Sequence, residues 1–357
     1  MIKKAKLPLN CDEELKVLLQ PFIKSYHKKL KIKRIKNAFV TYEGLVLKNG
    51  FLMLGSAFNL IGIRDKTFYI QFWRLAFEKW LVSKYGKTIP FEKVNETIAV
   101  IHSKWFNYGF WLNSYVPRLL ELKESGKAFK LMVPSHWKNI PYVKAVLDEI
   151  ECEQIIIPQD HQVFASEVLL PETRKWTASI DDKRIQLVRN TFINIANQKV
   201  KAKTFPKKIY LTRKNRGNRC AENEGEVMEL LAQYGFEIVA FEDYTIWEQI
   251  KMVSEASHLV SIHGAGLTNL IFLPNEAYVL ELVNRQYAHK EYTFPFWKLA
   301  QTIELNYSIQ LCEATNQTGK ISYGKETNSI NESEYLVNSN LVVSIEKLKS
   351  NINTFIS

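Results

Sequence analysis

The sequence predicts an α/β protein built from two βαβ-type halves that are joined by a linker. The chain has 357 residues, and at about 150 residues per domain this length favours two domains. Short apolar runs rich in β-branched residues alternate with segments of helical spacing in two separate blocks. This alternation is typical of parallel sheets covered by helices. The four cysteines are far apart and form no C-x-x-C pair, so neither a disulfide scaffold nor a zinc site is indicated.

The excess positive charge is concentrated near the N-terminus. The chain carries +11, and residues 1–60 contain twelve basic against four acidic residues, most of the basic ones within residues 24–39. Such a run is compatible with a solvated face, or with binding of anionic lipid head groups or a charged polymer. The N-terminus has no apolar signal-peptide region, and no apolar run approaches the roughly 18 residues that span a bilayer. We therefore expect a cytoplasmic protein that is either free in solution or attached only peripherally to the inner face of the membrane.

The first block becomes clear at residue 97. Before it, residues 38–95 contain short β-like runs, among them Phe51–Leu54 and Thr67–Phe72. The block itself predicts strands at 97–103, 128–134 and 154–158, with helices at 105–126 and 141–151.

The second block follows a connecting helix predicted over residues 181–200. Its helix at 222–236 closes at Gly235, and Thr245 with Glu248 forms a capping box that opens the next helix. The remaining segments are a polar, turn-rich loop at 313–340 and an amphipathic C-terminal helix that packs back on the body. The predicted strands of this block are 208–213, 237–241, 259–264 and 278–283.

The most informative segment is HLVSIHGAGLTNLIFLP, residues 258–274, in which an apolar strand runs directly into a glycine-rich turn and a helix. Ligands of open parallel sheets bind beyond the carboxyl ends of the strands. Small residues there let a ligand approach the backbone, and the N–H groups that open the helix suit a phosphate. A tight turn with a packed histidine is the alternative. The candidate binding residues are His263, Gly264, Ala265, Gly266, Leu267, Thr268 and Asn269.

A basic loop follows the first strand of the same half. Guanidinium groups match phosphate oxygens and stay charged at any relevant pH. A solvated loop explains any one of these arginines, but their convergence with the glycine turn on one sheet edge favours a diphosphate site. Its residues are Arg213, Lys214, Arg216 and Arg219, followed by Asn223 and Glu224 at the start of the next helix.

Glu281 lies inside the apolar strand that follows the glycine turn. A buried carboxylate requires hydrogen-bond donors, and ribose hydroxyls would supply them. The alternative is an edge-strand glutamate that faces water.

Together these motifs resemble glycosyltransferase family 61. The resemblance runs through R-x₅-R-x₃-N-E, then Gly235-Phe236, Glu248-Gln249, H-G-A-G-L-T-N and the Glu281 strand; it covers roughly residues 100–310 and is strongest over 209–283. It implies a GT-B fold, in which two Rossmann-like domains face each other across a cleft. It also implies an inverting, metal-independent transfer from a nucleotide-sugar, UDP-linked by preference, to a glycan or lipid-linked glycan in capsular or surface-polysaccharide biosynthesis.

On this resemblance the chain divides into an acceptor-side domain (1–180), a linker (181–205), a nucleotide-sugar domain (206–312) and a C-terminal segment (313–357). The segment 107–119 departs from the family pattern, because Phe110 stands where the family has histidine and Ser114 lies near its expected acid. The candidates for the catalytic base are His102 first, then Asp160 and His161.

Three alternatives remain open at this point. They are a polysaccharide pyruvyl transferase-like enzyme, a non-catalytic scaffold of polysaccharide assembly, and a nucleic-acid-binding protein. The last is disfavoured because the chain has no RNP, zinc-finger or helix-turn-helix signature.

Overall fold

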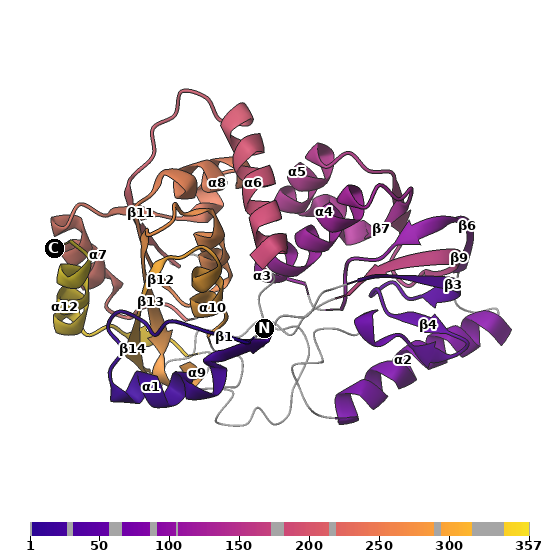
Figure 1. The fold of residues 1–357 in the computed structure, drawn as a ribbon, viewed down its shortest axis with the longest axis horizontal. Coiled ribbons are helices and arrows are strands. Elements are labelled where there is room, and N and C mark those ends of the chain that lie inside the picture. The colour runs from indigo at the N-terminus through magenta and orange to yellow at the C-terminus, as the bar shows by residue number, and fades with distance from the viewer. Residues whose placement is uncertain are drawn as a thin grey trace. The chain divides into compact units, whose positions relative to one another are not determined.

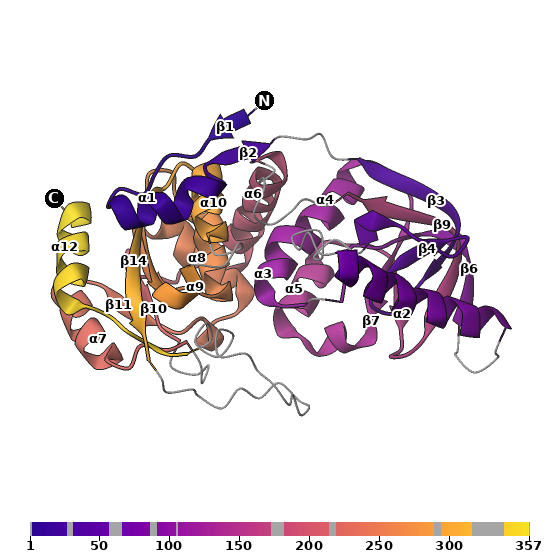
Figure 2. The same ribbon diagram turned by 90° about the horizontal axis from the view of Figure 1, so that it is seen from below.

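The computed structural model divides into two compact units. It describes residues 2–26, 31–56, 66–85, 91–104, 106–172, 182–213, 219–288, 294–315 and 339–356. Unit 1 comprises Met1–Tyr26 with Arg189–Ser357, and unit 2 comprises His27–Val188 (Figures 1 and 2). The first 26 residues, which the sequence placed in the N-terminal domain, therefore lie with the C-terminal half.

Unit 1 is built on a six-stranded sheet. The first five strands in spatial order are parallel to one another, and the sixth is antiparallel. The order is β11 (Glu237–Val239), β10 (Lys208–Leu211), β12 (His258–Ile262), β13 (Tyr278–Asn284), β14 (Asn306–Ala314) and β15 (Leu341–Val342). The four strands of the predicted second block are thus confirmed as neighbours in one parallel sheet, and β14 is an addition.

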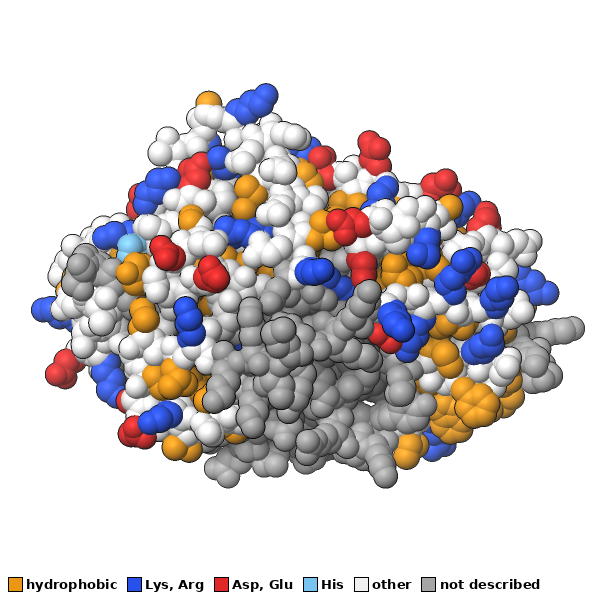
Figure 3. Space-filling view, viewed as in Figure 1, with side chains coloured by type: hydrophobic (Ala, Val, Ile, Leu, Met, Phe, Trp, Pro, Cys, Tyr) orange, Lys and Arg blue, Asp and Glu red, His pale blue; other side chains and the backbone are white. Residues whose placement is uncertain are grey.

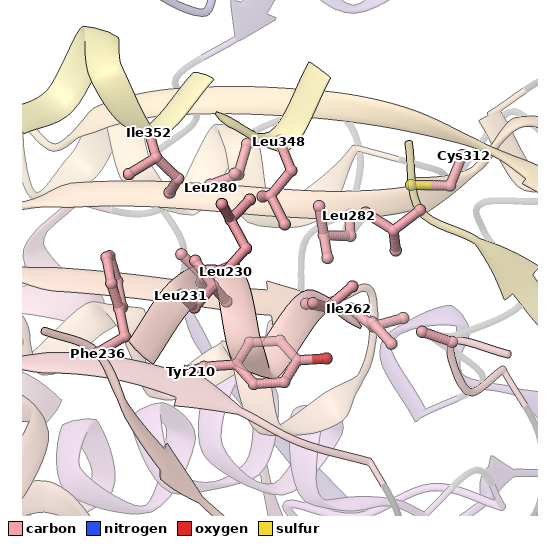
Figure 4. Close-up of a cluster of buried hydrophobic side chains, with 14 of the residues drawn as sticks. Tyr210, Leu230, Leu231, Phe236, Ile262, Leu280, Leu282, Cys312, Leu348 and Ile352 are labelled. Carbon is pink, nitrogen blue, oxygen red and sulfur yellow. The ribbon is translucent and has the colours of Figure 1, made fainter. Parts of the chain in front are cut away.

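Helices cover both faces of this sheet (Figure 1). On one face, α7 (Glu224–Gln233) and α12 (Ile345–Ile356) pack side by side, with Leu230 and Leu348 buried against Leu280 of β13 (Figure 4). The C-terminal helix does pack back, as the sequence predicted. The helices of the other face are α8 (Ile246–Glu255), η7 (Ala265–Phe272) and α10 (Pro295–Thr302).

Residues near the N-terminus join unit 1 by hydrogen bonds to β14. The Asn10 side chain both donates to the Ile309 carbonyl oxygen and accepts from the Ile309 N–H, and the Leu9 N–H donates to Tyr307. These bonds explain why this part of the chain does not stay with unit 2. The small elements of unit 1 are β1 (Ile2–Lys4), α1 (Glu13–Leu19), η1 (Gln20–Phe22), β2 (Lys24–Tyr26), η6 (Phe241–Asp243) and α9 (Arg285–Ala288).

Unit 2 has a seven-stranded mixed sheet. β6, β7, β8 and β9 run parallel, whereas β3, β4 and β5 form antiparallel pairs. The spatial order is β5 (Phe51–Leu52), β4 (Val46–Lys48), β3 (Ile32–Val40), β9 (Gln162–Pro171), β6 (Phe91–Ala99), β7 (Lys130–Pro134) and β8 (Gln154–Ile157). The first predicted block is confirmed in β7 and β8, whereas β6 begins at Phe91 and shares only residues 97–99 with the strand predicted at 97–103. The sequence missed β3 and β9.

The helices of unit 2 include the two that the sequence predicted for the first block. They are α2 (Lys66–Tyr85), α3 (Tyr108–Phe110), the π-helical turn η4 (Trp111–Tyr115), α4 (Val116–Glu124), α5 (Pro141–Glu149) and the short η2 (Leu54–Ser56) and η5 (Ser135–Asn139). The β-like reading of Thr67–Phe72 was wrong, because this run lies in α2. Aromatic residues at helical spacing, Trp73, Phe77 and Trp80, pack this helix against the sheet.

The junction helix α6 (Asp182–Lys199) confirms the predicted connecting helix, and the division between the units falls within it. The capping box is also confirmed, since Thr245 and Glu248 bond reciprocally at the start of α8. The polar loop falls mostly outside the described residues. None of the described helices is both long enough and apolar enough to cross a bilayer.

Candidate functional site

The strand order of unit 1 contains a topological switch point between β10 and β12. The chain passes from β10 to β11 on one side of β10, and then from β12 to β13 and β14 on the other side. The connections that follow β10 and β12 therefore leave these two neighbouring strands in opposite directions. Ligands of such sheets bind in the crevice beyond the carboxyl ends of the strands at this point. Arg213 follows β10 and Gly264 follows β12 at that edge.

Arg213 lies directly against the glycine turn. Its Nη1 is 3.5 Å from the carbonyl oxygen of His263, within reach of a long hydrogen bond. A Cβ atom on Gly264 would lie only 1.8 Å from the same Nη1. The absence of a side chain at Gly264 is therefore what lets the guanidinium occupy this position beside the backbone.

A buried carboxylate orients the histidine of the turn. Nδ1 of His263 donates to Oε1 of Glu281 at 2.5 Å, and the Tyr307 hydroxyl donates to Oε2 at 2.7 Å. Glu281 is fully buried, and burial together with this carboxylate raises the pKa of Tyr307 well above its usual value. The donors to Glu281 are thus two protein side chains, where the sequence had suggested ribose hydroxyls.

The helix after the turn is a 3₁₀-helix, η7, where the sequence suggested a short helix of unspecified type from Gly266. Ala265 and Gly266 are partly exposed at its start, whereas Leu267 is core. The first N–H groups of such a helix have no intrahelical acceptor. Thr268 is fully buried, and among the described residues its hydroxyl has no hydrogen-bond partner. Asn269 is also buried, and its side-chain amide donates to the Gly266 carbonyl oxygen.

The predicted basic loop lies only partly in the described structure, because Lys214 and Arg216 fall outside it. Arg219 is half-buried with a positive φ of 53°. Asn223 bonds both ways to the Val343 backbone, and Glu224 accepts hydrogen bonds from Tyr210 and Thr212. Glu224 thus joins the start of α7 to β10, and Asn223 joins it to the segment after β15.

His102 follows β6 in unit 2 and is buried, with 1% of its surface exposed. Its Nε2 lies 3.0 Å from the Tyr42 carbonyl oxygen, so this nitrogen carries the proton and donates it. Nδ1 then has the lone pair, and it has no hydrogen-bond partner in the described part of the chain. Burial, with a smaller contribution from the Arg118 charge, lowers the pKa of His102 to about 4. The imidazole is therefore neutral at pH 7.

Asp160 and His161, the other two base candidates, occupy the turn between β8 and β9. Asp160 is exposed and has a positive φ of 66°, and His161 is half-buried with Nδ1 3.2 Å from the Gln159 carbonyl oxygen. Within the described residues, neither shares a hydrogen bond or ion pair with His102. The structure therefore does not join the three candidates into one hydrogen-bonded cluster.

Arg118 is a feature of unit 2 whose importance the sequence analysis did not bring out. Its side chain is buried, and none of its three guanidinium nitrogens has a hydrogen-bond partner among the described residues. Burial lowers the pKa of Arg118 to about 9. It follows the π-helical turn η4, and such turns frequently occur at functional sites. The signal available in the sequence was Arg118 itself, within the segment 107–119.

Among the described residues, no three His, Cys, Asp or Glu side chains gather closely enough to hold a metal ion. At the switch point, Arg213 carries a positive charge, and the start of η7 presents backbone N–H groups.

Comparison with known proteins adds an independent observation. Residues 108–280 match the family model described as Glycosyltransferase 61. The chain carries a glycosyltransferase family 61 domain. The glycosyltransferase match begins at α3 in unit 2 and ends in β13 of unit 1, next to Glu281. The resemblance noted from the sequence motifs is therefore confirmed.

Named relatives of the glycosyltransferase domain are animal enzymes. Protein O-linked-mannose beta-1,4-N-acetylglucosaminyltransferase 2 is 45% identical over 69 residues in Homo sapiens and 32% identical over 110 residues in Xenopus tropicalis. The matches cover 18% and 30% of this chain and 12% and 19% of those proteins. The EGF domain-specific O-linked N-acetylglucosamine transferase of Drosophila melanogaster is 36% identical over 78 residues, 21% of this chain and 15% of that protein. The chain thus matches less than a fifth of the length of each of these relatives.

Proposed function

We propose that this protein is an inverting glycosyltransferase that moves a sugar from a nucleotide diphosphate-sugar, UDP-linked by preference, to a hydroxyl group of a glycan. The observation that carries the proposal is the position of the Arg213 guanidinium against Gly264 at the switch point of a parallel sheet. A glycine turn, a helix start and an arginine together suit a diphosphate.

In the proposed reaction an acceptor oxygen attacks the anomeric carbon while the bond from that carbon to the diphosphate breaks. Negative charge then develops on the departing diphosphate. Arg213 and the N–H groups that open η7 would stabilise this charge, with no metal ion required. His263, held by Glu281, would present its ring to the same group. The acceptor proton passes to a general base, and the configuration at the anomeric carbon inverts.

For the general base we propose His102 first, because the lone pair of its neutral imidazole is not engaged by the described residues. Its burial and its lowered pKa count against it, since a base acts best near the operating pH and within reach of the acceptor. Asp160 and His161 are more accessible. Comparison of His102→Gln, Asp160→Asn and His161→Gln for transfer rate, with donor affinity measured in parallel, identifies the base as the variant that loses rate alone.

The acceptor that we propose is a glycan or lipid-linked glycan of surface-polysaccharide biosynthesis, met at the cytoplasmic face of a membrane. The basic residues within 24–39 support this placement, since anionic head groups attract such runs. The relatives named above act, by their names, on O-linked mannose and on EGF domains.

A thermal-shift panel of UDP-, GDP-, dTDP- and CMP-sugars tests the proposal directly. A donor present at about 100 times its Kd stabilises the protein by ~2.7 kcal/mol. We expect a UDP-sugar to raise the melting temperature and Arg213→Gln to abolish the rise. Stabilisation by phosphoenolpyruvate without any response to nucleotides would overturn the proposal in favour of a pyruvyl transferase.

A further inference from the structure

Unit 2 contains a pocket that lies outside every candidate site described above. It has a volume of about 510 Å³ and is formed by β3, β9 and β6 with the end of α2 and the β4–β5 turn. This volume is within the range of about 300–1,000 Å³ that is typical of ligand sites. Figure 3 shows hydrophobic side chains gathered over the part of unit 2 that contains α2.

Four aromatic side chains are among the residues that line this pocket. Phe164 of β9 lies between Phe39 and Phe91, with ring centroids 4.9 Å and 5.2 Å away, and Trp80 of α2 lines the same space. Phe39 is buried, whereas Phe91 is 39% exposed and Phe164 is partly exposed. The pocket therefore presents ring surface to a ligand.

Polar side chains line the same pocket, and the strands are distorted at their position. Ser166 of β9 lies opposite Asn37, where β3 takes a positive φ of 52°. On its other side the β6 register shifts between Val94 and Thr97, and the Ser166 hydroxyl donates to the Asn95 carbonyl oxygen at 2.6 Å. Irregularities of this kind re-aim side chains and are over-represented beside functional sites. Both neighbouring strands thus place an asparagine beside Ser166.

Four polar side chains that line the pocket are exposed: Asn37, Asn49, Lys93 and Asn95. Within the described residues, the amides of Asn37, Asn49 and Asn95 make no hydrogen bond, and Lys93 makes no ion pair. Each amide offers two donors and an acceptor. A ligand for this pocket therefore needs an apolar face for the rings and a rim of hydroxyl groups for the amides.

We propose that this pocket is a second carbohydrate-binding site, which holds a glycan chain apart from the donor site of unit 1. A pyranose ring has this combination of a C–H face and a hydroxyl rim. Lys93 would select among glycans, because its ammonium group pairs with the carboxylate of a uronic acid. The proposal goes beyond the transfer reaction and needs no residue assigned to it.

Isothermal titration of the full chain tests the site with three probes: chitotetraose, xylotetraose and a hyaluronan tetrasaccharide, each up to about 10 mM. We expect at least one to bind, with affinity reduced about tenfold in Phe91→Ser and in Asn95→Ala. Lys93→Gln should weaken the uronic-acid probe alone. Phe51→Ser is the matched control, since Phe51 is a 71% exposed aromatic residue on the same sheet and does not line the pocket.

Unchanged melting temperatures establish that the variants fold. UDP stabilisation is measured on the same samples, so failure of the donor site and failure of this pocket are distinguishable. Absence of binding by all three probes overturns the proposal. So does binding that Phe51→Ser weakens as much as Phe91→Ser does.

Discussion

Oε1 of Glu281 accepts a hydrogen bond from Nδ1 of His263 at 2.5 Å, and both side chains are almost completely buried. The bond fixes the tautomer and the direction of the imidazole at the carboxyl end of β12. Because Glu281 sits on the neighbouring strand β13, the sheet itself sets this geometry.

Replacing Glu281 with glutamine should therefore weaken donor binding. A hydrogen bond to a charged group contributes about 1.5–3 kcal/mol, so we expect the UDP-sugar affinity to fall about tenfold to a hundredfold. Titration calorimetry measures this fall. Tyr307→Phe removes the other donor to the same carboxylate and should lower the free energy of unfolding by ~1–3 kcal/mol with a smaller effect on binding. Equal affinity of Glu281→Gln and wild type for the UDP-sugar would contradict the assignment of His263 to the donor site.

Gly264→Ala should displace the Arg213 guanidinium with little loss of stability. The new methyl group would overlap Nη1 at 1.8 Å, and a flexible side chain can move away, whereas the backbone of Gly264 is extended and accepts alanine. We expect donor affinity to approach that of Arg213→Gln. Gly225→Ala in α7 is the control, because a Cβ there meets no atom within 4 Å. A Gly264→Ala protein that binds the donor normally would contradict the assignment of Arg213.

Arg118→Met should stabilise the protein and impair its activity. The guanidinium carbon of Arg118 lies 5.9 Å from the centroid of the Tyr115 ring, but among the described residues this buried charge has no hydrogen-bond partner. Replacing buried charged groups with apolar ones of similar size can stabilise a protein by about 1–4 kcal/mol. Urea unfolding measures the gain. Arg74→Met provides the control, since Arg74 is exposed in α2 beside Glu78 and should change stability little. If Arg118→Met is less stable than wild type, the guanidinium stabilises the fold. Its burial would then be explained without a role in activity.

His102 should make stability depend on pH between about 4 and 6.5. Burial lowers its pKa from the usual 6.5 to about 4 in the folded protein, so the unfolded chain binds more protons in this window. Its stabilising contribution is complete above pH 6.5 and is lost as the pH falls towards 4. The loss is on the order of 3 kcal/mol, at 1.36 kcal/mol per unit. Denaturation of His102→Gln at several pH values should give a flatter profile than that of wild type.

Neutralising the basic residues from Lys28 to Lys36 should reduce binding to anionic liposomes. Near a charged surface each basic residue contributes about 1 kcal/mol. Two are already engaged within unit 2, because Lys33 lies 3.2 Å from Glu172 and Arg34 lies 2.8 Å from Glu167. We therefore expect partial loss in sedimentation with phosphatidylserine vesicles and no binding to phosphatidylcholine vesicles. Retained binding would show that the run is only a solvated face of β3.

The parallel strands β7, β8, β10, β11, β12 and β13 were predictable because each is a short apolar run next to a helix. β3 and β9 were not, since the basic side chains of β3 hide its alternation and its pairing partner lies more than a hundred residues away. The same limit applies to Asn10, which bonds to Ile309. At the proposed donor site, the glycine turn and Arg213 could be recognised from the local sequence alone. The partners of Glu281 were not, because strand register brings them together.

The return of the chain to unit 1 has a consequence for synthesis. Residues 2–26 leave the ribosome before any of unit 2, while β14, to which Asn10 bonds, follows unit 2 entirely. Domains generally fold as units while the chain is being made. Unit 2 can therefore fold first. Residues 2–26 cannot form their hydrogen bonds to β14 until that strand has been synthesised. Expressing unit 1 alone requires joining residues 1–26 to the C-terminal half.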